Sequence, residues 1–424
     1  MKRIAIIALA LALSAGAFAE EATKVNAKIY GFVRTYFAFD TRDSNAGTED
    51  LFYYMPNPES LNDAGNDVNA VPTMRFAALT SRLGVNISGG EVLGYKLGGK
   101  IETDFYSLAA PSSTSSKKVS GTAQLRLRQA FATVEKNGRS WKIGQAWHPM
   151  AADLPDIFSL DSGVPFAPFS RTPLVNFNWN FAGRWTLNTS AIWQMQYTST
   201  GPLGAVADYM RYSCTPEMYV GVTCGEGANL FRLAADFVSI KPRNFTSTGT
   251  KASDRLTTWN LFFYGQQRLG NWDSKLKVVY ANDGSHINMV GGYGISGVLD
   301  DGSYTYSATR NLSAWATFSR KVKDCPWVPQ IFLGYCKMFG TSEDILAAAP
   351  GGEKVFYEKL NASTVAGMWR IQPEILYNLG KLSIGAEYML TGVNYGRSTN
   401  ARRQAQDIYS VANHRIQMMV KYTF

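Results

Sequence analysis

The sequence predicts an all-β protein: one transmembrane antiparallel β-barrel of 16 strands whose third loop folds into the lumen. Three observations lead to this prediction. Apolar and polar residues alternate with a period of two in many segments, and short turns rich in Gly, Asn and Asp separate these segments. Charged residues make up only 18% of the chain, below the roughly 25% typical of soluble proteins, while aromatic residues make up 13%.

The first 19 of the 424 residues have the pattern of a cleaved signal peptide. Lys2 and Arg3 form a basic start, residues 4–13 form an apolar core, and residues 17–19 form an A-x-A cleavage site. The core is too short to be a membrane anchor, and no later segment has the run of about 18 apolar residues that a helical span needs. We therefore expect an exported protein with a single domain over residues 20–424. Its net charge falls from +9 to +7 with the loss of the two leader cations.

The alternation is clearest in the last ten residues. Every even-numbered residue from Ile416 to Phe424 is apolar or aromatic, and the odd-numbered residues are polar except for Met419. A strand that ends in Phe, with Tyr two residues earlier, is typical of the closing strand of an outer-membrane barrel. A strand of a soluble sandwich is the alternative. We see no helical segment long enough to cover so regular an apolar face, whereas lipid covers it in a barrel.

Hairpin counting gives an even number of strands joined by seven short turns and eight longer loops. Sixteen strands are expected near residues 27–40, 73–88, 94–107, 122–136, 140–147, 174–181, 184–197, 216–224, 229–241, 255–267, 273–282, 307–321, 327–339, 364–378, 382–395 and 414–424. The short turns are expected at residues 89–91, 136–139, 182–184, 225–227, 269–271, 323–326 and 379–381. Aromatic residues restart the chain after most turns, as an interfacial girdle requires, at Tyr95, Trp141, Trp185, Phe231, Trp272 and Trp327.

The third loop, residues 148–173, is the expected constriction of the lumen. It contains five prolines, many apolar residues that favour packing against a wall, and the acidic residues Asp153, Asp156 and Asp161 against a single basic residue, Arg171. An ordinary exposed loop is the alternative. The loops at residues 41–72, 198–215, 283–306 and 340–363 are expected to be long and exposed.

Basic residues on the first strands take the lumen-facing phase. They are Arg34, Arg82, Lys96, Lys100, Arg126 and Arg128. Facing the loop acids across a narrow pore, they would create a transverse field and influence ion selectivity. Wall salt bridges with Glu102 and Asp104 are an equal alternative for any one of them. Arg75 has the opposite phase and joins the set only if a bulge intervenes.

The four cysteines and three histidines predict no disulfide scaffold and no metal site. Cys214 and Cys224 bracket one expected strand, and Cys325 and Cys336 bracket another. Ten extended residues span about 33 Å, so neither pair can form a disulfide if these strands are correct. His148, His286 and His414 are isolated in the sequence. We expect no cofactor and no bound metal.

Several segments resemble a known family. Lys28–Arg34, Lys421–Phe424, residues 216–221 and residues 289–296 are similar to general diffusion porins of the outer membrane, and most of all to the DcaP-like trimeric porins in the version found in Bacteroidota. The resemblance implies a homotrimer in the Gram-negative outer membrane, in contact with lipid and lipopolysaccharide. Only residues 20–27 precede the first strand, so the coiled-coil extension of some DcaP-like porins is not expected.

The function that follows is a water-filled channel for passive diffusion of small hydrophilic solutes and ions. It is not expected to be an enzyme or to bind nucleic acid. An outer-membrane barrel enzyme such as a hydrolase, a substrate-specific channel and an adhesin on a barrel scaffold remain alternatives. The sequence leaves open which solute permeates and whether anions or cations are preferred.

Overall fold

The computed structural model describes residues 25–48, 50–106 and 123–424, and nearly all of its regular structure is β-strand. The predicted signal peptide lies outside these residues. The strands are β1 (Asn26–Asp40), β2 (Ser44–Gly47), β3 (Phe52–Pro56), β4 (Thr73–Ala77), β5 (Arg82–Val92), β6 (Tyr95–Tyr106), β7 (Gln124–Lys136), β8 (Arg139–Trp147), β9 (Arg171–Ala182), β10 (Trp185–Ile192), β11 (Glu217–Glu226), β12 (Asn229–Ile240), β13 (Leu256–Leu269), β14 (Trp272–Asn282), β15 (Gly291–Val298), β16 (Tyr304–Arg320), β17 (Trp327–Thr341), β18 (Phe356–Lys359), β19 (Val365–Leu379), β20 (Leu382–Thr399) and β21 (Ala405–Thr423). The helical segments are η1 (Pro149–Ala151), α2 (Asp208–Ser213), η2 (Gly284–Ile287) and η3 (Pro350–Gly352). No helix in the described ranges is long and apolar enough to cross a membrane.

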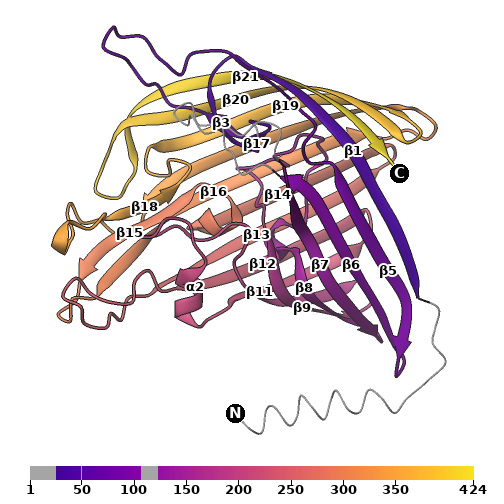
Figure 1. Ribbon diagram of the computed structural model, residues 1–424, viewed down its shortest axis with the longest axis horizontal. Coiled ribbons are helices and arrows are strands. Elements are labelled where there is room, and N and C mark those ends of the chain that lie inside the picture. The colour runs from indigo at the N-terminus through magenta and orange to yellow at the C-terminus, as the bar shows by residue number, and fades with distance from the viewer. Residues whose placement is uncertain (1–24, 49, 107–122) are drawn as a thin grey trace.

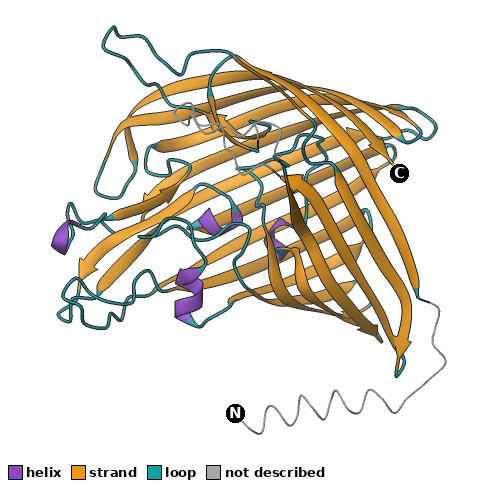
Figure 2. Cartoon of the chain, viewed as in Figure 1, coloured by secondary structure: helices purple, strands orange, loops and turns teal. Residues whose placement is uncertain are grey.

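The wall strands form a closed antiparallel barrel (Figure 1). Each pairs with its neighbours along the chain, and β1 closes the sheet by pairing with β21, from Phe32 opposite Thr423 to Asp40 opposite Arg415. The wall has 16 strands when β4 and β5 are taken as one interrupted strand and the loop strands β2, β3, β15 and β18 are set aside. This confirms the predicted fold class and strand number. Short turns gather at one end of the barrel and longer loops at the other (Figure 2).

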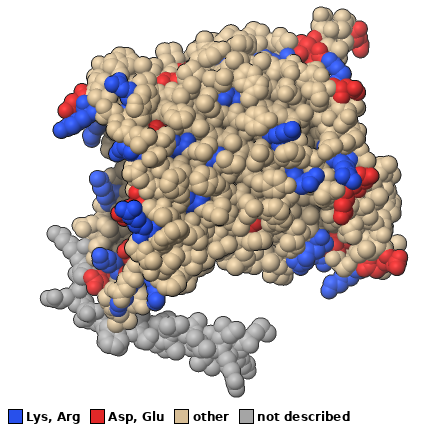
Figure 3. Space-filling view, turned by 180° about the vertical axis from the view of Figure 1, so that it is seen from behind, with Lys and Arg blue, Asp and Glu red and all other residues tan. Residues whose placement is uncertain are grey.

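The outer surface has the pattern of a lipid-facing wall. The six aromatic residues expected to form a girdle, Tyr95, Trp141, Trp185, Phe231, Trp272 and Trp327, are all exposed, by 43–54%. Seen from behind, the middle of the barrel is largely free of acidic side chains, which lie mostly near the two ends (Figure 3). Large exposed apolar side chains on the wall and acidic side chains near its two ends match the hydrocarbon layer of a bilayer and its two interfaces.

The height of the wall varies around the barrel. Strands β5 to β10 have 8 to 13 residues each. Strands β16, β17, β19, β20 and β21 have 15 to 19. A transmembrane strand needs about 9–11 residues, so the second group extends well beyond the bilayer. Polar residues within residues 396–413 break the apolar alternation there, and this is why the sequence ended β20 too early, at residue 395, and started β21 too late, at residue 414.

One turn predicted near the start of the barrel is wrong, and the irregularity on which the orientation of Arg75 depended is present. The turn expected at residues 89–91 is a β-bulge, because Gly89 has φ +91° and β5 continues to Val92 before turning at Leu93 and Gly94. Residues 78–81 interrupt the second wall strand and shift its phase by one residue. Arg75 therefore lies opposite the buried Ala38, on the inner face, and ion-pairs with Asp50.

Two of the loops that were expected to be exposed fold into the barrel. Phe52, Tyr53 and Met55 of the first loop are buried, and so are Ile287 and Met289 of the loop after β14. Their apolar side chains pack against the third loop and the inner wall instead of facing solvent. All four cysteines are free, which confirms that neither sequential pair forms a disulfide.

Candidate functional site

The third loop, between β8 and β9, crosses the lumen and packs against the inner wall. Met150, Phe166 and Ala167 are buried, and Ser313 of β16 donates a hydrogen bond of 2.9 Å to the carbonyl of Phe166. Gly334 of β17 makes this contact possible, because a Cβ there would lie 2.7 Å from the Phe166 ring. The predicted inward fold is confirmed, although the loop ends earlier than expected, at the start of β9.

Each acidic residue of the loop forms an ion pair with a basic residue of the inner wall. Asp153 pairs with Arg232 of β12 at 2.7 Å and with Lys277 of β14 at 3.5 Å. Asp156 pairs with Lys275 of β14 at 2.7 Å and with Lys321 at 3.5 Å. Asp161 pairs with the fully buried Arg370 of β19 at 2.9 Å. We call β12, β14, β16, β17 and β19 the anchoring wall, because they hold the loop.

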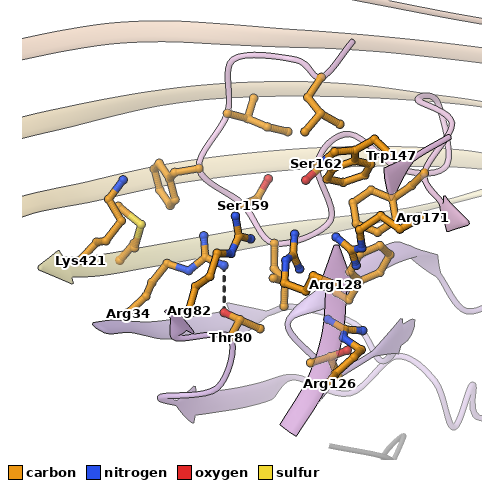
Figure 4. Close-up of a pocket in the computed structure, with 18 of the residues that line it drawn as sticks. Arg34, Thr80, Arg82, Arg126, Arg128, Trp147, Ser159, Ser162, Arg171 and Lys421 are labelled. Carbon is orange, nitrogen blue, oxygen red and sulfur yellow. Dashed lines mark hydrogen bonds between the residues drawn. The ribbon is translucent and has the colours of Figure 1, made fainter. Parts of the chain in front are cut away.

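The opposite wall, formed by β21, β1, β5, β7 and β9, remains strongly basic. A cavity of about 330 Å³ lies between this wall and the loop. Its lining includes six cationic side chains and, within the described ranges, no carboxylate: Arg34, Arg82, Arg126, Arg128, Arg171 and Lys421. Figure 4 shows the five arginines gathered opposite Ser159 and Ser162 of the loop, with Lys421 to one side. We call the wall that bears these residues the arginine wall.

Two carboxylates lie behind the arginines and neutralise part of their charge. Asp104 accepts two hydrogen bonds from Arg126, at 2.8 and 2.9 Å, and one from Arg128 at 2.7 Å. Glu102 accepts from Arg128 at 2.8 Å and lies 3.7 Å from Arg82. Both carboxylates are at most 2% exposed. Six cations against these two anions leave a net charge of +4 at the cavity.

Arg34 and Arg171 are held mainly by neutral groups. Arg34 donates to the hydroxyl of Thr80 at 2.9 Å, as drawn in Figure 4, and its guanidinium lies 4.9 Å from the ring centre of Tyr36. Arg171 lies 4.8 Å from the ring centre of Trp147, and neither of its Nη atoms has a hydrogen-bond partner in the described part of the chain. Because aromatic rings attract cations without cancelling their charge, and no described carboxylate ion-pairs with Arg34 or Arg171, neither charge is neutralised by a partner in the described ranges.

The six basic residues selected from the sequence are not all at this cavity. Arg34, Arg82, Arg126 and Arg128 line it. Lys100 lies on β6, nearer the short-turn end than Glu102, from which it is 3.5 Å away. Lys96 lies next to the short turn, opposite Glu135 in the register. Arg126 and Arg128 form the expected salt bridges with Asp104 and Glu102 and also line the cavity.

The acids of the third loop differ from the expectation. They do not line the cavity, because the cations of the anchoring wall draw them to the other side of the loop. Two further carboxylates, Glu374 and Glu387, are buried beneath the loop, where Glu374 accepts from the amide of Phe158 at 3.3 Å. The loop therefore presents neutral and apolar side chains to the arginine wall.

Sequence reasoning missed two of the six cations. Arg171 was noted only as the single basic residue of the third loop, although it opens β9. Lys421 was assigned to the polar face of the last strand but was not included among the basic residues of the lumen. The closure of the barrel supplies the missing signal, because it places Lys421 opposite Arg34 in the register.

The fold is that of outer-membrane porins. The chain is similar to the outer membrane channel DcaP of Acinetobacter baumannii, with 20% identity, a TM-score of 0.65, and coverage of 94% of this chain and 97% of that one. It is similar to an anion-selective porin from Comamonas acidovorans, with 11% identity, a TM-score of 0.54, and coverage of 95% and 100%. It is also similar to Salmonella typhi OmpF in complex with daunomycin, with 11% identity, a TM-score of 0.51, and coverage of 95% and 98%. No family model and no curated protein matches the sequence.

Proposed function

We propose that the protein is an outer-membrane porin through which small hydrophilic solutes diffuse passively, and that it prefers anions. The observation that carries the preference is the cavity beside the third loop, which six cations line and to which none of the described residues contributes a carboxylate. Clustered cations in a narrow passage with low-dielectric walls raise the local concentration of anions and exclude cations.

Four residues selected from the sequence, Arg34, Arg82, Arg126 and Arg128, would act at the narrowest part of the path, together with Arg171 and Lys421. Lys96 and Lys100 would contribute to the potential nearer the short-turn end. Asp153, Asp156 and Asp161 would shape the path indirectly, by fixing the loop to the anchoring wall. This division of roles rests on the ion pairs of the loop and on the lining of the cavity.

Insertion of the purified protein into a planar bilayer tests the channel itself. We expect discrete steps of conductance that scale with KCl concentration, as for a water-filled pore. Absence of conductance from correctly folded protein would refute the proposal. A barrel enzyme would in that case become the better hypothesis.

We also propose that the chain is exported by the signal peptide at residues 1–19 and assembles as a homotrimer of the DcaP-like kind found in Bacteroidota. The short strands β4 to β7 support this assembly, because Met74, Phe76 and Leu125 on their outer face are each at least two-thirds exposed. Contact with lipopolysaccharide through basic loops is part of the same proposal. Chemical cross-linking in detergent should give a product three times the mass of the monomer, and a persistent monomer would refute it.

A further inference from the structure

Two histidines and two acids far apart in the sequence meet on the inner side of β11 and β12. His148 begins the third loop, Glu217 is the first residue of β11, Asp236 lies within β12 and His286 lies in η2. All four side chains are at most 1% exposed. A ligand atom from each of His148, Glu217 and Asp236 lies within 4.8 Å of the others. The channel function proposed above uses none of these residues.

His286 is oriented as a metal ligand. Its Nδ1 lies 3.2 Å from the carbonyl oxygen of Asp283, so Nδ1–H donates to that oxygen and the lone pair is left on Nε2. Metal-binding histidines commonly have a backbone carbonyl or carboxylate in this outer position. The Nε2 atom is buried and has no hydrogen-bond partner among the described residues.

The distances around Nε2 fit an ion better than direct hydrogen bonds. Nε2 of His286 lies 3.7 Å from Oε1 of Glu217 and 3.5 Å from Oδ2 of Asp236, beyond ordinary hydrogen-bond length. Ligands about 2.1 Å from a tetrahedral zinc ion lie roughly 3.4 Å from one another. Oε2 of Glu217 and Oδ1 of Asp236 are also buried without partners in the described part of the chain.

His148 occupies a different position. The backbone N–H of Met150 donates to its Nδ1 at 3.1 Å, so the proton of the neutral ring is on Nε2, which hydrogen-bonds to Glu217. This tautomer cannot offer an Nε2 lone pair to a metal ion. Instead it orients the Glu217 carboxylate, as Asn260 orients Asp236 through a hydrogen bond of 3.0 Å.

We propose that Glu217, Asp236 and His286 bind one divalent transition-metal ion, best fitted by Zn²⁺, and that His148 is a positioning residue for Glu217. One imidazole and two carboxylates are ligands that zinc accepts, and a water molecule would complete a tetrahedral site. The ion would join the loop after β14 to the barrel wall. It would also stabilise the third loop, because the amide of Phe169 donates to the carbonyl of Ile287 at 2.8 Å.

Zinc binding by the folded, full-length protein tests this proposal. The protein is purified in detergent without a polyhistidine tag, treated with EDTA, dialysed and titrated with ZnCl₂, and bound zinc per chain is measured by mass spectrometry and calorimetry. We expect one zinc ion per chain and a higher unfolding temperature with zinc. If the folded wild-type protein binds no stoichiometric zinc, the cluster is a buried network of ion pairs and hydrogen bonds, and the proposal is overturned.

Three histidine variants separate the roles. H286Q should abolish binding, and H148Q should weaken it roughly 10- to 100-fold, as expected for an outer-shell partner. H414Q is the matched control, because His414 lies on the outer face, where it is hydrogen-bonded to Tyr388. The H414Q variant should bind zinc like the wild type. D236N replaces H286Q if the latter does not fold, as judged by heat-modifiable migration in gels. Unchanged binding by H286Q or D236N would overturn the assigned ligands.

Discussion

The two walls on either side of the third loop both carry buried cations, but they differ in where the counter-charges lie. On the anchoring wall, Asp153, Asp156 and Asp161 of the loop pair with Arg232, Lys275 and Arg370. On the arginine wall, the only acids paired with the cavity cations among the described residues are Glu102 and Asp104 of β6, the strand between β5 and β7 of that wall.

This difference gives the loop two distinct faces. On one face, the acidic side chains form ion pairs with the anchoring wall, and these pairs fix the loop in the lumen. The other face presents side chains such as Ser159, Ser162 and Leu160 to the arginines. A loop whose own composition is acidic therefore leaves the passage beside it positively charged. Net loop charge is a poor guide to selectivity, because the direction of each side chain decides which space its charge affects.

Reversing two charges on the arginine wall should have the largest effect. In the double variant Arg34→Glu with Lys421→Glu, the net charge of +4 at the cavity falls by four and becomes zero. We expect the anion preference to disappear in a reversal-potential measurement with a KCl gradient. Neither residue has an ion-pair partner in the described ranges, so the barrel should still fold. A double variant as anion-selective as the wild type would show that ions do not pass this cluster.

Breaking the most buried pair of the anchoring wall should loosen the loop. In Asp161→Asn, Arg370 remains charged and buried without its partner, which costs about 3–5 kcal/mol of the free energy of unfolding. Urea titration in detergent measures this loss. The control is Asp344→Asn, whose pair with Arg402 is exposed and should contribute about 1 kcal/mol or less. Equal losses in the two variants would contradict the anchoring role.

Releasing one cation of the anchoring wall should make the two walls more alike. Asp156→Asn removes the carboxylate that pairs with Lys275 and Lys321. The passage gains one positive charge, so we expect a modest rise in the ratio of chloride to potassium permeability. The change should be smaller than in the double variant, because one charge unit changes instead of four. An unchanged ratio would mean that the pair of Asp156 and Lys275 does not act on the permeation path.

The smallest expected effect depends on pH. Burial lowers the pKa of Lys359 to about 7, although Asp283 opposes the shift. Its Nζ atom lies 4.3 Å from the ring centre of Tyr197, which lines the cavity. Below pH 7 the amine gains a proton and adds a positive charge, so anion preference should rise slightly as the pH falls from 8 to 6. Lys359→Met should remove this dependence on pH. If the anion preference of the variant changes with pH as it does in the wild type, another group is responsible.

The sequence was sufficient to predict the barrel, its 16 strands and the inward third loop, because period-two alternation, turn residues and girdle aromatics are local signals. It also placed Arg126 and Arg128 on the inner face beside Glu102 and Asp104. It could not predict that Asp161 pairs with Arg370, which is 209 residues away. Such pairings depend on the three-dimensional path of the loop.

The histidine cluster was not predicted from the sequence, because this cluster also depends on the three-dimensional path of the loops. His148 and His286 are isolated in the sequence and meet only because the third loop and the loop after β14 both fold inward. Arg75 was left out because residues 78–81 change the phase of the strand, and nothing in the local pattern marks that interruption. Local periodicity predicts strands well, but a single irregularity reverses which side chains face the lumen.

The reversal potential of the wild-type protein in a tenfold KCl gradient tests the central claim most directly. The claim is that the arginine wall, and not the acidic loop, sets the selectivity of the passage. We predict a potential displaced from zero towards the chloride limit of about 59 mV. A potential of zero, or one displaced towards the potassium limit, would contradict it.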